Sequence, residues 1–305
     1  MSDKIIAIIE LDRFPGEVAS RAALLAKLYE CDLHLLLSDP TVGILRQKLI
    51  VSNEAKEIAK NITTAQQRLL ADLSDSVAAE NDMVVTTAIS HDRPASDAII
   101  AAALEIEPRF VVKGTYFHSA AERATIVEVD WQLIRRLDYP LWLVKPAKWK
   151  DPPVIIAAVD PTHADDESGS LDQGIVDLGK ELARQSGGSM MLFHTYERLV
   201  EIGTYATFEF KPVKVPVDEL DENLKTRHRK LLNDLAAAND IPHEDVHQLP
   251  GRTRELLPTF ARAHGASVVI MGAVCRTGFK RRVLGSTAEQ VLDHLPCDIL
   301  IARGG

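Results

Sequence analysis

The chain repeats one pattern of strands and helices twice, and this repeat limits the folds it can adopt more than any other feature. The first half opens with an apolar strand that ends in an acid, from Lys4 to Glu10, and the second half opens in the same way, from Val154 to Asp160. An amphipathic helix with apolar residues every three or four positions follows each strand. Such a repeat predicts two copies of one domain.

Each half continues with four further strands, separated by helices. The expected strands are 33–37, 83–89, 110–112 and 141–144 in the first half, and 190–193, 245–249, 268–271 and 299–301 in the second. The apolar faces of the two longest helices are expected at Ile58, Ile62, Ala65, Leu69 and Leu73, and at Leu220, Leu224, Leu231 and Leu235. The alternation predicts an α/β fold: two tandem open parallel five-stranded sheets with helices on both faces.

A proline-rich segment, 146–153, separates the two halves, and its prolines interrupt regular structure. A chain of 305 residues is long enough to bury two cores. We therefore expect one domain over residues 1–148 and a second over residues 149–305.

One stretch of the second half has the features of an anion site. The strand 268–271 ends at Gly272, a basic loop containing Arg276 follows, and a helix begins around Gly285, Ser286 and Thr287. Free amides and the positive end of a helix dipole favour a negatively charged ligand there. Glycines let the backbone come close to it.

This stretch resembles the nucleotide-binding signature of the universal stress protein family, G-x2-G-x9-G-[ST]. Gly272, Gly285 and Ser286 match the signature, whereas Cys275 stands where the family has its second glycine. The resemblance covers both halves and is closest to the tandem, E-type members of the family. It implies that Asp160 contacts the adenine or ribose of ATP or another adenine nucleotide, while the two glycines and Ser286 hold its phosphates.

Several of these residues have a second interpretation, which the sequence leaves open. Asp160 either contacts the ligand or bonds loop amides at the end of its strand. Ser286 and Glu289 form a capping box, which is compatible with phosphate binding nearby. The cluster 280–282 either neutralises phosphate or forms a solvated surface. The acidic run 165–167 either holds a magnesium ion that accompanies the nucleotide or begins a solvated helix.

The first half has lost the features of this site. Phe117 and Val127 stand where the two later glycines of the signature belong, and Glu10 replaces the strand-end aspartate. Side chains at the glycine positions fill the space in which phosphates would meet bare amides. We expect a nucleotide in the second half alone, and we interpret Asp130 and Trp131 as packing residues.

The segment from His243 to His247 matches the zinc-protease pattern H-E-x-x-H. That chemistry needs a helix, in which both histidines share one face. Pro242 and Pro250 bracket the segment, and the repeat predicts a strand, which would place the histidines about 13 Å apart. We expect neither a metal site nor a catalytic residue.

Composition excludes several classes of protein. A net charge of −9 argues against nucleic-acid binding through the overall field. The three cysteines form no CxxC pair, which favours a reduced compartment. No apolar stretch approaches the length of a membrane span. We expect a cytoplasmic protein without a membrane or nucleic-acid partner.

The sequence contains neither a G-x-S-x-G elbow nor a full Walker loop, so we expect a non-enzymatic stress-response protein, with slow ATP hydrolysis left open. The resemblance also implies that the two domains pair through their fifth strands as an internal pseudo-dimer, with a homodimer as a further assembly. The alternative is a module that uses the former nucleotide cleft for a small apolar or amphipathic ligand or a partner protein. Tyr205, Phe208 and Phe210 are the residues that favour it.

Overall fold

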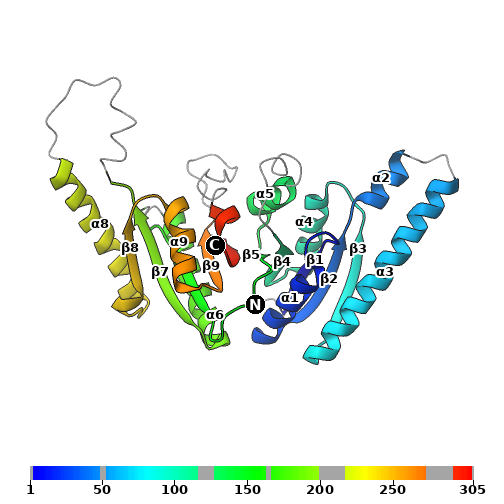
Figure 1. Cartoon of the computed structure of the whole chain (residues 1–305), viewed down its shortest axis with the longest axis horizontal. Helices are drawn as coiled ribbons and strands as arrows, with labels where there is room; N and C mark the ends of the chain where they lie inside the picture. Colours follow the sequence, from blue (N-terminus) through cyan, green and yellow to red (C-terminus); the bar gives the residue numbers. More distant parts are fainter. Residues whose placement is uncertain are drawn as a thin grey trace, which may run out of the picture. The chain divides into compact units, whose positions relative to one another are not determined.

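The computed structural model describes residues 3–48, 53–115, 127–162, 166–198, 217–272 and 291–303. These residues form two compact units that divide between Ala147 and Lys148. The part before this point is called unit 1 and the part after it unit 2. In each unit the strands lie side by side and helices pack along them (Figure 1).

The described residues of unit 1 form five strands and the helices between them. Its elements are β1 (Lys4–Ile9), α1 (Pro15–Leu28), β2 (Asp32–Ser38), α2 (Thr41–Lys48), α3 (Asn53–Asn81), β3 (Val85–Ser90), α4 (Ala95–Ile106), β4 (Phe110–Gly114), α5 (Val127–Arg136) and β5 (Leu141–Val144). The strand order is β3-β2-β1-β4-β5, and all neighbours are parallel. The order reverses between β1 and β4, the point where ligands bind in such sheets.

Unit 2 repeats this arrangement. Its elements are β6 (Val154–Ala158), α6 (Asp166–Ser186), β7 (Ser189–Tyr196), α8 (Val217–Ala238), the 3₁₀ turn η2 (His243–Asp245), β8 (Val246–Pro250), α9 (Thr253–His264), β9 (Val268–Gly272) and β10 (Asp298–Ala302). The strand order is β8-β7-β6-β9-β10, again with parallel neighbours. The predicted α/β fold, with five parallel strands contributed by each half of the chain, is therefore confirmed, and each expected strand is present within a few residues.

The central strands explain why this prediction succeeds. Every residue of β1 from Ile5 to Ile9 is fully buried, as are Phe110, Val111 and Val112 in β4. Side chains of a strand alternate between the two faces, so uninterrupted burial requires cover on both faces. A continuous apolar run is therefore a strong signal for a central parallel strand.

The predicted apolar faces of the long helices are wrong by about one position. In α3 Ile58 is 51% exposed and Leu69 is 39% exposed. The buried stripe instead contains Ala55, Ala59, Gln66, Leu70, Ser74 and Val77. Small residues let the helix approach the sheet closely, and Gln66 is buried because its amide donates to Asp39 Oδ2 at 2.6 Å.

Helix α8 departs from the prediction in the same way. Leu232 and Ala236 are buried, whereas the predicted Leu220 is 40% exposed. The expected elements also do not include α2. That helix begins where Asp39 accepts hydrogen bonds from the backbone nitrogen of Thr41 at 2.9 Å and from its hydroxyl. A carboxylate that satisfies a free helix amide is a common start signal. None of the described helices is long and apolar enough to cross a membrane.

Candidate functional site

The predicted site of unit 2 lies at the carboxyl ends of β6 and β9. Ala158 is paired with Met271, so Asp160 and Gly272 emerge at the same edge of the sheet. The side chain of Asp160 is 50% exposed, so its carboxylate is not buried at this edge. The structure therefore brings together the two site residues that it describes.

The local contacts of Asp160 fix its position. Its backbone nitrogen donates to Asp172 Oδ1 at 3.1 Å, and Asp172 is almost buried on α6. One carboxylate oxygen, Oδ1, accepts a hydrogen bond from the hydroxyl of Thr162 at 2.7 Å. Asp160 thus closes a turn at the end of its strand through the hydroxyl of Thr162, and its half-exposed carboxylate is compatible with both of its interpretations.

A pair of histidines, which the sequence analysis missed, lies beside Asp160. His194 on β7 is 2% exposed, and its Nδ1 lies 3.0 Å from the backbone oxygen of Val159. A carbonyl only accepts, so this nitrogen carries the proton. Nε2 of His194 lies 2.8 Å from Nδ1 of His228 on α8, and the two rings share a hydrogen bond. The pair ties α8 to the strand end, with His194 Nδ1 3.9 Å from Asp160 Oδ1.

Packing against α6 already favours glycine at position 272, independently of any ligand. A Cβ atom at this position would lie 2.5 Å from Cδ2 of Leu171 on α6. Its counterpart Gly114 in unit 1 is confined by backbone, because a Cβ there would lie 2.6 Å from the backbone oxygen of Arg13. Glycine is therefore needed at position 114 whether or not a ligand binds, whereas at position 272 the close atom belongs to a flexible leucine side chain that can move.

The rest of the predicted site lies outside the described residues, and its assignment stays a prediction. This applies to Cys275, Arg276, Gly285, Ser286 and Thr287. It also applies to Phe117, to the basic cluster 280–282, to the aromatic residues 205, 208 and 210, and to the side chains of Val127 and of the acidic run 165–167.

The corresponding edge of unit 1 holds a buried ion cluster. Its members are Glu10, Arg13, Lys113 and Asp130, which we call the unit 1 ion cluster. Lys113 Nζ contacts Glu10 Oε2 and lies 2.8 Å from Asp130 Oδ1. Arg13 lies 3.1 Å from Asp130 Oδ2 and 3.4 Å from Glu10 Oε2. Two cations and two carboxylates therefore neutralise one another at the carboxyl ends of β1 and β4.

The cluster is removed from water. The side chain of Lys113 is 0% exposed, those of Arg13 and Asp130 are 4% and 8% exposed, and that of Glu10 is 14% exposed. Buried charges of this kind persist only when they are paired. Asp130 therefore has an ionic role that its interpretation as a packing residue did not include. Lys113 could have indicated a buried ionic partner, because this lysine interrupts a strand that is otherwise buried and apolar.

The H-E-x-x-H segment does not form the helix that a zinc site needs. His243 lies in η2 and His247 in β8, so the expected strand begins one residue later than predicted. His243 is hydrogen-bonded to Arg229 at 3.1 Å, while His247 packs 5.0 Å from the ring of Phe260. Burial lowers the pKa of His247, with a further contribution from the neighbouring His264. Within the described ranges, no group of three or more His, Cys, Asp or Glu residues is arranged to hold a metal ion.

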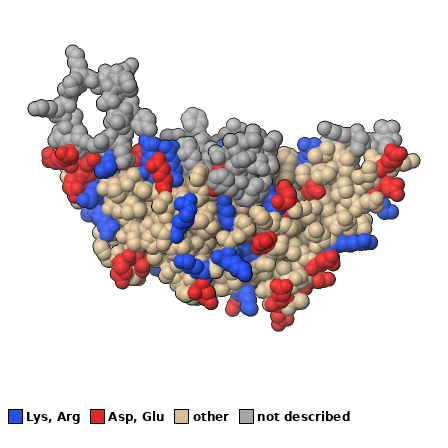
Figure 2. Space-filling view, in the orientation of Figure 1, with Lys and Arg blue, Asp and Glu red and all other residues tan. Residues whose placement is uncertain are grey.

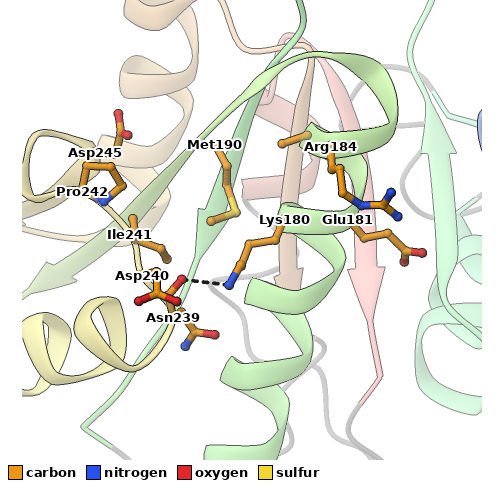
Figure 3. Close-up of a pocket in the computed structure, with 10 residues that line it drawn as sticks. Lys180, Glu181, Arg184, Met190, Asn239, Asp240, Ile241, Pro242 and Asp245 are labelled. Atoms are coloured by element: carbon orange, nitrogen blue, oxygen red, sulfur yellow. Dashed lines mark hydrogen bonds between the residues drawn. The ribbon is translucent and has the colours of Figure 1, made fainter.

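A cavity of about 560 Å³ lies at the opposite end of the strands of unit 2 (Figure 3). It lies between α6 and the segment that follows α8, where Lys180 Nζ donates to the backbone oxygen of Asn239 at 2.8 Å. Its walls carry both cations and carboxylates, among them Arg184 and Asp240. Acidic and basic side chains are likewise intermingled over the surface in Figure 2. The mixed charge gives this cavity no preference for an anionic ligand.

Comparison with known proteins assigns both halves of the chain to the same protein family. Residues 1–145 and 151–303 match the model of the universal stress protein family. Universal stress protein E of Escherichia coli strain K12 is 29% identical over 220 residues, which cover 70% of this chain and 66% of the relative. The matched region thus falls just short of two thirds of that relative's length.

Solved structures show the same fold over the full length. A functionally unknown protein from Pseudomonas aeruginosa PAO1, PA1789, is 24% identical with a TM-score of 0.69, covering 99% of this chain and 93% of its own. A universal stress protein from Archaeoglobus fulgidus is 13% identical with a TM-score of 0.65 over 100% of both chains. A universal stress protein solved in complex with cAMP is 20% identical over 50% of this chain and 96% of its own, with a TM-score of 0.30. At that score, the likeness carries no argument for this chain.

Proposed function

This chain belongs to the universal stress protein family as a tandem member with two family domains, and we propose that it is a cytoplasmic, non-enzymatic stress-response protein that binds an adenine nucleotide in unit 2. The observation that supports the proposal is the difference between two equivalent sheet edges. In unit 2 the strand-end carboxylate, Asp160, is half exposed. In unit 1 the matching Glu10 is engaged by Lys113 and Arg13.

The residues of unit 2 suit the parts of a nucleotide. The exposed carboxylate of Asp160 can accept hydrogen bonds from ribose hydroxyls or from the adenine amino group. The predicted helix start at Gly285 and Ser286 offers free amides and a positive dipole to the phosphates. Arg276 and Thr287 add donors in the same loop, and the magnesium ion that accompanies ATP would bind through its phosphates.

Titration calorimetry with ATP on the full chain tests this proposal. Replacement of Gly285 by leucine places a side chain in the phosphate space, so binding is expected to disappear. Gly16→Leu is the matched control, because a Cβ atom at Gly16 meets nothing within 4 Å and the residue lies in unit 1. Equal ATP affinity in the native chain and the Gly285→Leu variant would contradict the proposal.

The alternative function has its own outcome in the same experiment. If neither the native chain nor a Cys275→Gly variant binds ATP at millimolar concentration, the cleft serves another ligand. That ligand would be a small apolar or amphipathic molecule or a partner protein, in contact with Tyr205, Phe208 and Phe210. Native mass measurement of the purified chain would then report a copurifying molecule.

A further inference from the structure

The cavity at the amino ends of the strands of unit 2 has two walls that the chain itself fixes. One wall is α6, and the other is the segment 239–245 between α8 and β8 (Figure 3). Asn239 is 5% exposed and joins the walls: its amide exchanges hydrogen bonds of 2.7 and 3.0 Å with that of Gln173, and its backbone oxygen accepts from Lys180. A volume of about 560 Å³ lies within the range of about 300–1,000 Å³ that is typical of small-molecule sites.

Part of the cavity lining is apolar. Ala183 and Met190 contribute from α6 and β7, and Ile241 and Pro242 contribute from the opposite wall. The thioether of Met190 occupies the space that a side chain at Gly179 would need, because a Cβ atom there would lie 2.4 Å from its sulfur. A methionine side chain is flexible and polarisable, so it adapts to apolar groups of different shape. These residues suit an aliphatic or aromatic side chain of a ligand.

Opposite charges face this cavity from its two walls. The ammonium of Lys180 on α6 uses one of its three N–H groups for the backbone oxygen of Asn239, at 2.8 Å, and two remain. On the other wall, the carboxylate of Asp240 has no hydrogen bond or ion pair with any residue that the structure describes. Arg184 and Asp245 add one further charge of each sign. The lining therefore offers a donor for an anionic group and an acceptor for a cationic group.

We propose that this cavity binds a small zwitterion with an apolar side chain, which is the chemistry of a free apolar amino acid. Lys180 donates to the carboxylate of the ligand, and Asp240 accepts from its ammonium group. Met190 and Ile241 pack against its side chain. Three carboxylates line the cavity against two cations, so phosphates are disfavoured. This inference concerns a second site and does not rest on nucleotide binding beside Asp160, at the opposite end of the strands.

Titration calorimetry on the full chain with L-leucine, L-methionine and L-phenylalanine tests the proposal. At least one of the three is expected to bind. The amide of the tightest ligand, which lacks the carboxylate, and its N-acetyl derivative, which lacks the ammonium group, are each expected to bind at least ten-fold more weakly. No binding of any of the three at millimolar concentration, or equal binding of both derivatives and the parent amino acid, would overturn the proposal.

Asp240→Asn is the variant that removes the acceptor for the ammonium group. Asp240 has a left-handed backbone with φ 56°, which asparagine adopts readily, so the fold of the segment is kept. The amino acid is expected to bind at least ten-fold more weakly. Asp82→Asn is the matched control, because Asp82 follows α3 in unit 1 with φ 50° and does not line the cavity. Unchanged affinity in Asp240→Asn, or an equal loss in both variants, would overturn the proposal.

Lys180→Met tests the other charge with a readout that a general loosening of the cavity would not give. The variant is expected to bind the amino acid and its amide equally, while it still prefers both over the N-acetyl derivative. A variant that keeps the native preference for the amino acid over its amide would overturn the assignment of Lys180. Gly285→Leu, which blocks the predicted phosphate space, is expected to leave amino-acid affinity unchanged, so failure of the nucleotide site and failure of this site are distinguishable.

Discussion

Lys113 in unit 1 and Met271 in unit 2 occupy the same place, one residue before the glycine that ends β4 and β9. Lys113 carries a cation into the buried edge of its sheet and gathers Glu10 and Asp130 around it. Met271 brings no charge, and the neighbouring Asp160 stays half exposed. One strand position thus distinguishes an edge whose charges are buried and paired from an edge whose carboxylate is half exposed.

A second position separates the units in the same way. His194 in unit 2 stands where unit 1 has Leu37, because Phe193 pairs with Ala158 as Leu36 pairs with Ile8. The imidazole contacts the backbone of Val159, the residue before Asp160. Two copies of one fold therefore place different chemistry at the same edge without any change in strand order.

The largest effect is expected from loss of the buried lysine. Lys113→Met copies unit 2 into unit 1 but leaves two carboxylates with Arg13 alone. Removal of one partner from a buried ion network costs roughly 3–5 kcal/mol of unfolding free energy. Urea denaturation measures the loss, and Lys230→Met, a change at a side chain that is 74% exposed, serves as the control.

A second variant tests whether the loss of stability comes from the unbalanced charge that Lys113→Met leaves. Lys113→Met with Asp130→Asn removes one charge of each sign and keeps the pairing of Arg13 with Glu10. It is expected to recover part of the lost stability. If Lys113→Met alone is no less stable than Lys230→Met, the cluster does not stabilise unit 1 in the way described.

The next largest effect is expected on ATP affinity, from a change at the half-exposed carboxylate of Asp160. Asp160→Asn removes the charge that would accept hydrogen bonds from the nucleotide, and a hydrogen bond to a charged group contributes about 1.5–3 kcal/mol. ATP affinity measured by calorimetry is therefore expected to fall about ten- to a hundred-fold. Asp234→Asn, on the exposed part of α8 where Asp234 pairs with Lys230, is the control. Unchanged affinity would leave Asp160 with its turn-closing role alone.

A smaller effect on ATP affinity is expected at Cys275, which stands where the signature has its second glycine. A left-handed backbone conformation costs a residue other than glycine roughly 1–2 kcal/mol. Cys275→Gly is therefore expected to strengthen ATP binding about ten-fold, or to create it where the native chain shows none. Equal affinity of the native and variant chains would show that Cys275 does not limit the site.

The smallest effect is expected at the histidine pair. His228→Phe keeps a ring beside His194 but removes the hydrogen bond between them, at a cost of about 0.5–1.5 kcal/mol of unfolding free energy. His243→Phe removes a hydrogen bond to Arg229 at an exposed position and is the control for the loss of a hydrogen bond near the surface, and urea denaturation compares the two. Equal stability of the two variants would mean that the pair does not tie α8 to β7.

The strands could be predicted from the sequence because central parallel strands need continuous apolar runs, and few other structures do. The helix faces could not be predicted as well, since the buried stripe of α3 uses Ala55, Ala59 and Gln66 while Ile58 and Leu69 remain exposed. Long aliphatic side chains dominate a hydrophobic pattern even where small residues make the closer contact.

The unit 1 ion cluster could not be predicted because its members are far apart in the chain. Arg13 and Asp130 are separated by 117 positions, and Glu10 and Lys113 by 103. Only the strand order shows that the ends of β1 and β4 meet. In unit 2 the sequence correctly places Asp160 and Gly272 at one edge, while the loop after Gly272 stays a prediction.

We propose that a nucleotide binds at the edge of unit 2 that carries Asp160 and not at the neutralised edge of unit 1. Photo-crosslinking of the full chain with 8-azido-ATP, followed by peptide mapping, distinguishes the two edges. One label per chain is expected, confined to peptides from residues 148–305 and suppressed by excess ATP. Labelled peptides from residues 1–147 that ATP protects would contradict it.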